Sequence, residues 1–121
     1  MLSLPPSVRI WIAAAPVDLR KGFDGLAAIV QGEWRRDLYA GHLFVFIGKR
    51  GNGCKILFWD RGGLVVHYKR LEQGRFRLAA GAGASHVELD STALAMLLDG
   101  IDISRVPRAK AWLPPKTASA A

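Results

Sequence analysis

The chain has 121 residues and a mass of 13.2 kDa, which is enough for one ordinary domain and too little for two. Half of the residues are hydrophobic, with four Trp and five Phe, so the chain can bury a core and is not disordered as a whole. The 17 Lys and Arg exceed the 10 Asp and Glu and give a formal net charge of +7. Such an excess favours a polyanionic partner, with nucleic acid ranked before an anionic membrane surface.

The single cysteine, Cys54, cannot form an internal disulfide, and zinc sites built on several thiolates are excluded. No apolar run approaches the roughly 20 residues of a transmembrane helix. Residues 10–15 resemble part of a signal peptide, but Pro5, Pro6 and Arg9 interrupt the segment where an apolar stretch belongs. We therefore predict a cytoplasmic protein without a membrane partner.

The first third of the chain predicts a strand followed by a helix. Residues 8–12 carry a β-branched side chain at every second position, which is typical of a strand. Apolar side chains then recur at helical spacing over residues 20–36. Asp18 is expected to cap this helix, because its carboxylate can accept a hydrogen bond from a free amide of the first turn.

The centre of the chain predicts an antiparallel meander. Glycine-rich turns separate four strand-like runs, at residues 43–47, 55–60, 64–71 and 75–78. Short connections of this kind favour antiparallel neighbours.

A short run at residues 85–89 precedes a second helix. Asp90 or Ser91 is expected to cap that helix, and Gly100 to stop it. We thus predict an α+β domain over residues 1–104, with a mostly antiparallel sheet of about five strands and two packed helices. The basic tail, residues 105–121, contains prolines and is predicted to be flexible.

The charge excess is concentrated in part of the chain. Residues 49–77 carry a net charge of +6 and the tail carries +4, whereas residues 78–104 carry −4. The predicted sheet therefore holds most of the cations in the domain.

Tight turns would pair Lys55 with Lys69, and Lys69 with Arg77, on one face of this sheet, with Arg75 and Trp59 beside them. Directly opposed like charges destabilise a sheet, so a row of cations indicates an anionic partner. The alternative is a solvated face whose lysines prevent aggregation, and a register shift of one residue would scatter the row. The opposite face would carry the core: Ile56, Phe58, Val66, Tyr68, Phe76 and Leu78.

Nine residues are predicted to contact nucleic acid: Arg20, Lys21, Lys49, Arg50, Lys55, Trp59, Lys69, Arg75 and Arg77. Lys49 and Arg50 lie in a glycine-rich turn that can add backbone amides to a phosphate-binding rim. Trp59 would stack on a base if its strand is exposed, with a buried Trp as the alternative. Arg20 and Lys21 precede a helix start, where free amides favour anions; a solvated first turn is an equal alternative.

No catalytic residue, metal or cofactor is predicted. Asp18, Asp24 and Asp60 would suit a two-metal nuclease, but cap and turn roles account for the first and the last. The three histidines lack metal-ligand spacing. Cys54 beside Lys55 would be reactive if its pKa were lowered, whereas an ordinary thiol is the simpler interpretation.

Several segments resemble a known family. Residues 17–26, VDLRKGFDGL, are similar to the DMRKGFDGL segment of the small TnpB-type accessory proteins of insertion-sequence family sixty-six, found in bacterial transposons. The similarity continues in order through residues 41–46, 55–60, 68–76 and 94–102, and spans about residues 5–103. The RNA-guided nuclease that shares the TnpB name is far larger and looks unrelated.

The resemblance implies a role in transposition beside a larger transposase that carries the cutting and joining chemistry. We expect a non-enzymatic, nucleoid-associated accessory protein that binds DNA through its basic sheet face and loop. One alternative is a module that docks on an acidic surface of the transposase without contacting DNA, and a second is a metal-dependent nuclease. The sequence leaves the oligomeric state and any base preference open.

Overall fold

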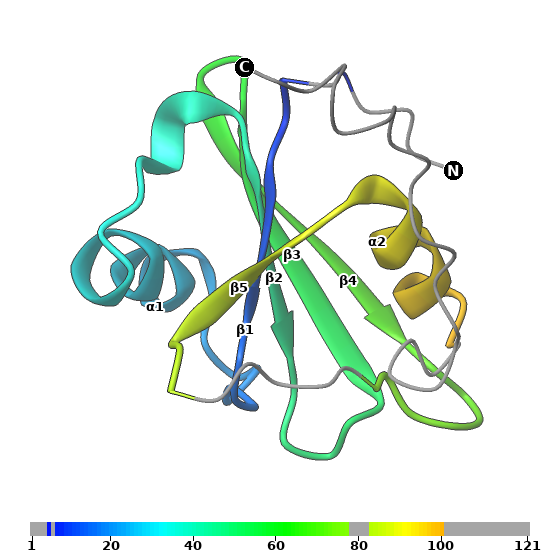
Figure 1. The fold of residues 1–121 in the computed structure, drawn as a ribbon. Helices are drawn as coiled ribbons and strands as arrows, with labels where there is room; N and C mark the ends of the chain where they lie inside the picture. Colours follow the sequence, from blue (N-terminus) through cyan, green and yellow to red (C-terminus); the bar gives the residue numbers. More distant parts are fainter. Residues whose placement is uncertain (1–4, 6, 78–82, 101–121) are drawn as a thin grey trace, which may run out of the picture.

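A five-stranded sheet forms the centre of the protein (Figure 1). The computed structural model describes residues 5, 7–77 and 83–100. The strands lie in the order β4-β3-β2-β1-β5, and β1 is parallel to β2 while the other neighbouring pairs are antiparallel. Their bounds are Ile10–Ala13 for β1, Leu43–Ile47 for β2, Gly53–Asp60 for β3, Gly63–Arg70 for β4 and His86–Leu89 for β5. The predicted α+β class is confirmed.

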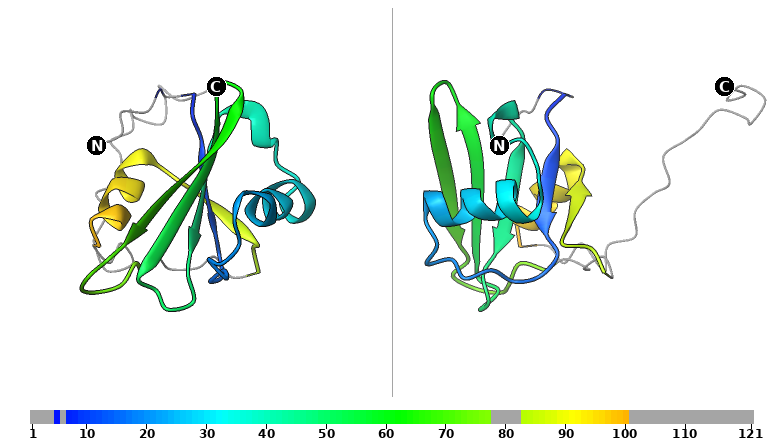
Figure 2. Two further views of the ribbon diagram at one scale, coloured as in Figure 1. Left: turned by 180° about the vertical axis from the view of Figure 1, so that it is seen from behind. Right: turned by 90° about the vertical axis from the view of Figure 1, so that its left-hand side faces the viewer.

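Helices cover both faces of the sheet. Helix α1, Phe23–Ala28, continues into a π-helical segment η1, Ile29–Glu33, on one face, and α2, Ser91–Leu98, lies on the other. In the right-hand view of Figure 2, α1 crosses in front of the sheet and α2 lies behind it. A short 3-10 turn, η2 at Leu38–Ala40, precedes β2. Within the described part of the chain, no helix has the length and apolar character needed to cross a bilayer.

The sheet has a core on each face, whereas the sequence predicted a core on only one. On the α1 side, Phe44 and Leu57 pack against Leu26. On the α2 side, Val45 and Ile56 pack with Leu94. The physical reason is the unbroken apolar sequence of β1 and β2, because strands buried on both faces lack polar alternation.

The predicted core residues are accordingly divided between the two faces. Ile56, Phe58 and Phe76 belong to the core on the α2 side. Val66 packs against the core on the α1 side, and Tyr68 on the same face of β4 is 57% exposed. Leu78 lies outside the described residues.

The predicted pairing of β3 with β4 is wrong by one residue. Asp60 pairs with Gly63, so Lys55 lies opposite Tyr68 and Lys69 lies opposite Cys54. The turn between the strands has only two residues, Arg61 and Gly62, both with positive φ, as in a tight hairpin. A shift of one residue moves each side chain to the other face, so Lys55 and Lys69 point to opposite sides of the sheet.

The strand predicted at residues 75–78 is also wrong over its described residues, 75–77. These residues leave the sheet, and the Phe76 amide donates a hydrogen bond to the Gly51 carbonyl at 2.7 Å. Phe76 itself is buried in the core on the α2 side. The fifth strand is instead β5, which pairs with β1, and the row that included Arg77 does not form.

Helix α1 begins three residues later than predicted. Its N-cap is Gly22, without a side-chain cap, because the Asp18 carboxylate instead accepts a hydrogen bond from the Arg20 amide two residues ahead. The predicted cap at Asp18 is therefore wrong, and the aspartate stabilises the preceding turn.

The second helix agrees with its prediction. The Asp90 side chain accepts a hydrogen bond from the Ala93 amide at 2.7 Å, which makes Asp90 the N-cap of α2. Gly100 has a φ of +79° just beyond the helix end. The predicted flexible tail, residues 105–121, lies outside the described residues.

Two sheet lysines bond to backbone carbonyls. The Lys55 ammonium donates to the Leu19 carbonyl at 2.6 Å and to the Lys21 carbonyl at 3.1 Å. The Lys69 ammonium donates to the Leu98 carbonyl, at the C-terminus of α2, where the helix dipole favours a cation. These lysines therefore attach a loop and a helix to opposite faces of the sheet.

We predict that Lys55→Met and Lys69→Met each lower the free energy of unfolding by about 1–2 kcal/mol, because each variant keeps the aliphatic stem and loses a charged hydrogen bond. Urea unfolding followed by tryptophan fluorescence measures the change. Lys49→Met, at an exposed loop position, is the matched control and should change stability by less than about 0.5 kcal/mol. Equal stability of all three variants would contradict the structural role.

Candidate nucleic-acid interface

The segment that follows β1 is attached to the end of β2 and to the loop between β2 and β3, residues 48–52. The Val17 amide donates to the Ile47 carbonyl at 2.9 Å, and Val17 forms an isolated bridge with Gly48. A Cβ built on Gly48 would lie only 2.9 Å from Leu19, so the leucine side chain packs directly on the loop backbone. Glycine at this position permits that approach.

The same loop holds the segment that follows β4. The Leu71 amide donates to the Asn52 carbonyl at 2.8 Å, and the Phe76 amide donates to the Gly51 carbonyl. Gly51 has a φ of +80°, and a Cβ placed there would lie 3.2 Å from the Arg75 side chain. The aliphatic part of Arg75 therefore lies over the loop.

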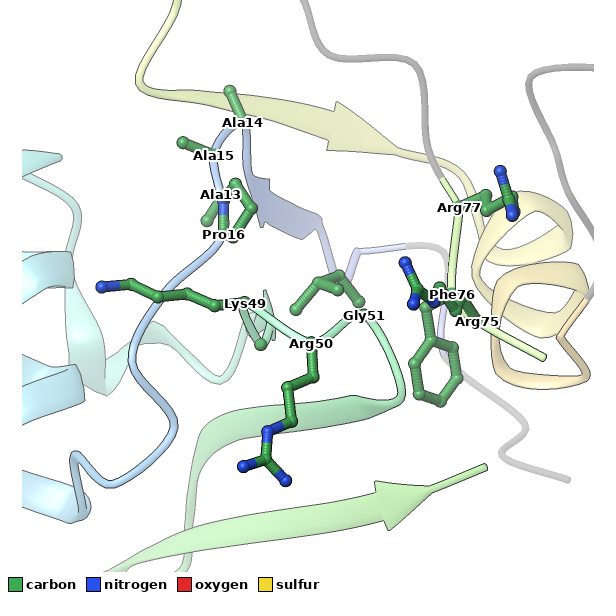
Figure 3. A pocket seen from close by; sticks show the side chains of 12 residues that line it. Ala13, Ala14, Ala15, Pro16, Lys49, Arg50, Gly51, Arg75, Phe76 and Arg77 are labelled. Carbon is green, nitrogen blue, oxygen red and sulfur yellow. The ribbon is translucent and has the colours of Figure 1, made fainter. Parts of the chain in front are cut away.

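These contacts create a basic cleft of about 390 Å³ (Figure 3). Its cations are Lys49 and Arg50 from the loop and Arg75 and Arg77 from the later segment, and none of the described residues that line it carries a carboxylate. All four side chains belong to exposed residues. The described residues that line it are Ala13, Ala14, Ala15, Pro16, Ile47, Gly48, Lys49, Arg50, Gly51, Arg75, Phe76 and Arg77.

The charged ends of the four cations of the basic cleft lie apart from one another. Figure 3 shows that their charged ends point in different directions around Gly51 and do not converge on one point. Within residues 7–77 and 83–100, none of them forms an ion pair. Such an arrangement suits a polyanion contacted at several places better than one small anion.

A second, mixed cleft of about 750 Å³ lies against the same loop and shares Gly48, Lys49 and Arg50 with the basic cleft. It combines cations, carboxylates and apolar side chains. Its other lining residues are Val17, Asp18, Leu19, Arg20, Asn52, Gly53, Tyr68, Arg70, Leu71 and Glu72.

Two ion pairs lie at the mixed cleft. Arg20 and Asp18 pair at 2.7 Å, and this hydrogen bond holds the pKa of the Asp18 carboxyl well below its usual range. Arg70 and Glu72 pair more loosely, at 3.4 Å. All four side chains remain solvent-accessible, so these pairs contribute little to folding stability.

The structure brings together four of the nine predicted nucleic-acid contacts, namely the cations of the basic cleft. Arg20 lies at the mixed cleft, and Lys21 is exposed just before α1. Trp59 is half-buried, with its ring edge-on to Tyr39 at 4.9 Å, towards the end of β3 away from the loop. The ammonium groups of Lys55 and Lys69 donate hydrogen bonds to backbone carbonyls, as described above.

Sequence reasoning did not identify Tyr68 and Arg70 as cleft residues. The signal was available in the Arg61-Gly62 dipeptide, because a two-residue turn gives the register that puts Tyr68 opposite Lys55. With that register, Tyr68 lies on the same face as Leu57, which is the α1 side of the sheet and not the α2 side.

Comparison with known proteins identifies the family. Residues 8–108 match the family described as "IS66 Orf2 like protein". The chain belongs to the IS66 Orf2-like family. It is 35% identical over 119 residues to "Uncharacterized protein y4jC" of Sinorhizobium fredii, covering 98% of this chain and all of that protein. It is 37% identical over 116 residues to "Uncharacterized protein y4hO" of the same organism, covering 96% of this chain and 98% of that protein.

Membership of the IS66 Orf2-like family makes the chain a transposition-associated accessory protein. The resemblance drawn from the sequence is therefore confirmed at the level of the family. No solved structure matches the chain.

Among the described residues of this IS66 Orf2-like chain, no three His, Cys, Asp or Glu side chains form a group that could hold a metal ion. His42 accepts a hydrogen bond from the Arg9 amide, and His86 stacks on Trp34. Desolvation lowers the pKa of His86, and the positive charge of Arg36 adds to this effect. Both rings thus have contacts within the fold.

Cys54 is buried on the α2 side of the sheet. Burial raises the pKa of its thiol to about 12, and the positive charge of Lys69 opposes only part of that effect. The hypothesis that its pKa is lowered is wrong, and the thiol stays protonated at neutral pH.

We predict slow alkylation of Cys54 in the folded protein. With a pKa of about 12 in place of 9.0, the thiolate fraction at pH 8 is lower by about three orders of magnitude, and burial also blocks the reagent. Iodoacetamide labelling followed by mass spectrometry measures the labelling rate of Cys54 in the folded protein. The same measurement in about 6 M urea gives the rate in the unfolded protein, which is the control. Labelling at the same rate in both conditions would contradict the buried position.

Proposed function

We propose that this IS66 Orf2-like protein acts in transposition by binding DNA through the basic cleft, in the bacterial cytoplasm at the nucleoid. The observation that carries the proposal is the convergence of two segments, residues 48–51 and 75–77, which bring four exposed cations together with no carboxylate among the described residues of the cleft. The protein contributes no cutting or joining chemistry in this proposal, and it acts beside the larger transposase of the same element.

The charge pattern supports a phosphate backbone as the ligand. Cations that repel one another are retained at the loop even though Lys49, Arg50, Arg75 and Arg77 form no ion pair among the described residues. Duplex DNA supplies closely spaced phosphates, and it offers several cations a partner at once. Contacts of this kind position a protein on DNA without selecting a base sequence.

The other predicted contacts are not used in the same way. Lys55 and Lys69 are fixed to carbonyl groups, so removing either should act through stability and not through phosphate binding. Trp59 lies away from the basic cleft and is not proposed to stack on a base. Arg20 and Lys21 precede a helix of six residues and are not proposed to form a separate anion site.

We predict that the double variant Arg75→Gln/Arg77→Gln weakens DNA binding and flattens the plot of log affinity against log salt. The slope should fall by about one per lost phosphate contact, and so by about two. Fluorescence anisotropy with a labelled duplex of the element end, across a salt series, measures it.

The control is Arg61→Gln, which makes the same Arg-to-Gln change outside the basic cleft and removes one positive charge at the β3–β4 turn, at the opposite end of β3. Its slope should equal that of the wild type. An unchanged slope in the double variant, or an equal change in the control, would overturn the proposed DNA site. Repeating the series with a random duplex tests whether the binding depends on sequence.

A further inference from the structure

The mixed cleft differs chemically from the basic cleft beside it. Both share Lys49 and Arg50, but only the mixed cleft contains carboxylates, those of Asp18 and Glu72. The carboxylates of Asp18 and Glu72 offset part of the positive charge of the mixed cleft, so a phosphodiester chain is attracted to it less strongly than to the basic cleft. The mixed cleft is therefore a poor continuation of the proposed DNA site.

An exposed aromatic side chain projects at the mixed cleft. Tyr68 is 57% exposed and lies on the edge strand β4. A Cβ built on Gly53 would lie 3.0 Å from Leu19 and 3.3 Å from the Tyr68 ring, so the two side chains meet over the glycine. The Lys55 ammonium lies 5.2 Å from the ring centre on the same face. The ring is thus held by the fold and yet accessible to a partner.

The charges of the mixed cleft indicate the chemistry of its partner. Four cations and two carboxylates line it, which leaves a net charge of +2. The looser ion pair, between Arg70 and Glu72 at 3.4 Å, leaves the guanidinium with donors for another carboxylate. Tyr and Arg are also the side chains that most often dominate the energy of protein interfaces.

We propose that the mixed cleft docks an acidic protein segment that carries an apolar side chain, with that side chain on Tyr68 and Leu19 and a carboxylate on Arg70. The inference rests on the proposed function in one respect, since we assign this segment to the transposase of the same element. The basic and mixed clefts would then hold DNA and transposase on two sides of one loop.

The test uses purified, nuclease-treated transposase of the same element as the probe and the immobilised full-length chain in biolayer interferometry. Wild type should bind without DNA. Tyr68→Thr, which removes the ring but puts another residue of high strand propensity in β4, and Arg70→Gln should each weaken binding by about tenfold or more. Thermal unfolding checks that both variants remain folded, and Arg70→Gln keeps the test valid if Tyr68→Thr does not.

The matched control is Arg61→Gln, which removes one positive charge as Arg70→Gln does and lies outside both clefts; it should change transposase binding by less than about twofold. Absence of transposase binding, wild-type binding by both mixed-cleft variants, or equal weakening in the control would overturn the inference. So would a loss of DNA affinity in Tyr68→Thr and Arg70→Gln with transposase binding intact, because the mixed cleft would then belong to the DNA site.

The DNA measurements on the same variants separate this inference from the proposed function. If the chain binds transposase through Tyr68 and Arg70 but binds no DNA, the DNA site fails and the docking site stands. If the salt slope depends on Arg75 and Arg77 while transposase does not bind, the docking site fails and the DNA site stands.

Discussion

The backbone of the β2–β3 loop is the constraint on which the arrangement of the surface depends. Its carbonyl groups at Gly51 and Asn52 accept hydrogen bonds from the later segment, and the adjoining Ile47 carbonyl accepts one from Val17. Each bond contributes only about 1 kcal/mol, but together they hold both segments against one short loop. The buried Phe76 ring anchors the later segment in the core. The two clefts exist because of these attachments.

The burial of both sheet faces determines which cations remain for a ligand. A segment packs on each face, and Lys55 on β3 and Lys69 on the edge strand β4 donate hydrogen bonds to backbone carbonyls of these segments. Lys55 secures the turn before α1, and Lys69 stabilises the end of α2. Two cations of the central segment, Lys55 and Lys69, therefore stabilise the fold, whereas the cations of the basic cleft remain exposed to a ligand.

The sequence predicted the fold class, the first strand, β2 and the second helix with its Asp90 cap, because local patterns define them. It named the four cations of the basic cleft but not their arrangement, because that arrangement depends on register and on long-range hydrogen bonds. A turn one residue shorter than assumed moved Lys55 and Lys69 to opposite faces. The Phe76–Gly51 bond that places Arg75 and Arg77 beside the loop has no local sequence signal. The unbroken apolar run of β2 was an unused signal for a sheet with a core on each face.

The central claim is that two segments, held together by the loop backbone, form one DNA-binding surface. An amide NMR titration of the ¹⁵N-labelled protein with a short duplex tests it most directly, because it reports on each segment separately. The account predicts that the largest shift changes occur together at residues 48–52 and 75–77, with the β3–β4 turn unaffected. Changes confined to one of the two segments, or centred on the β3–β4 turn, would contradict it.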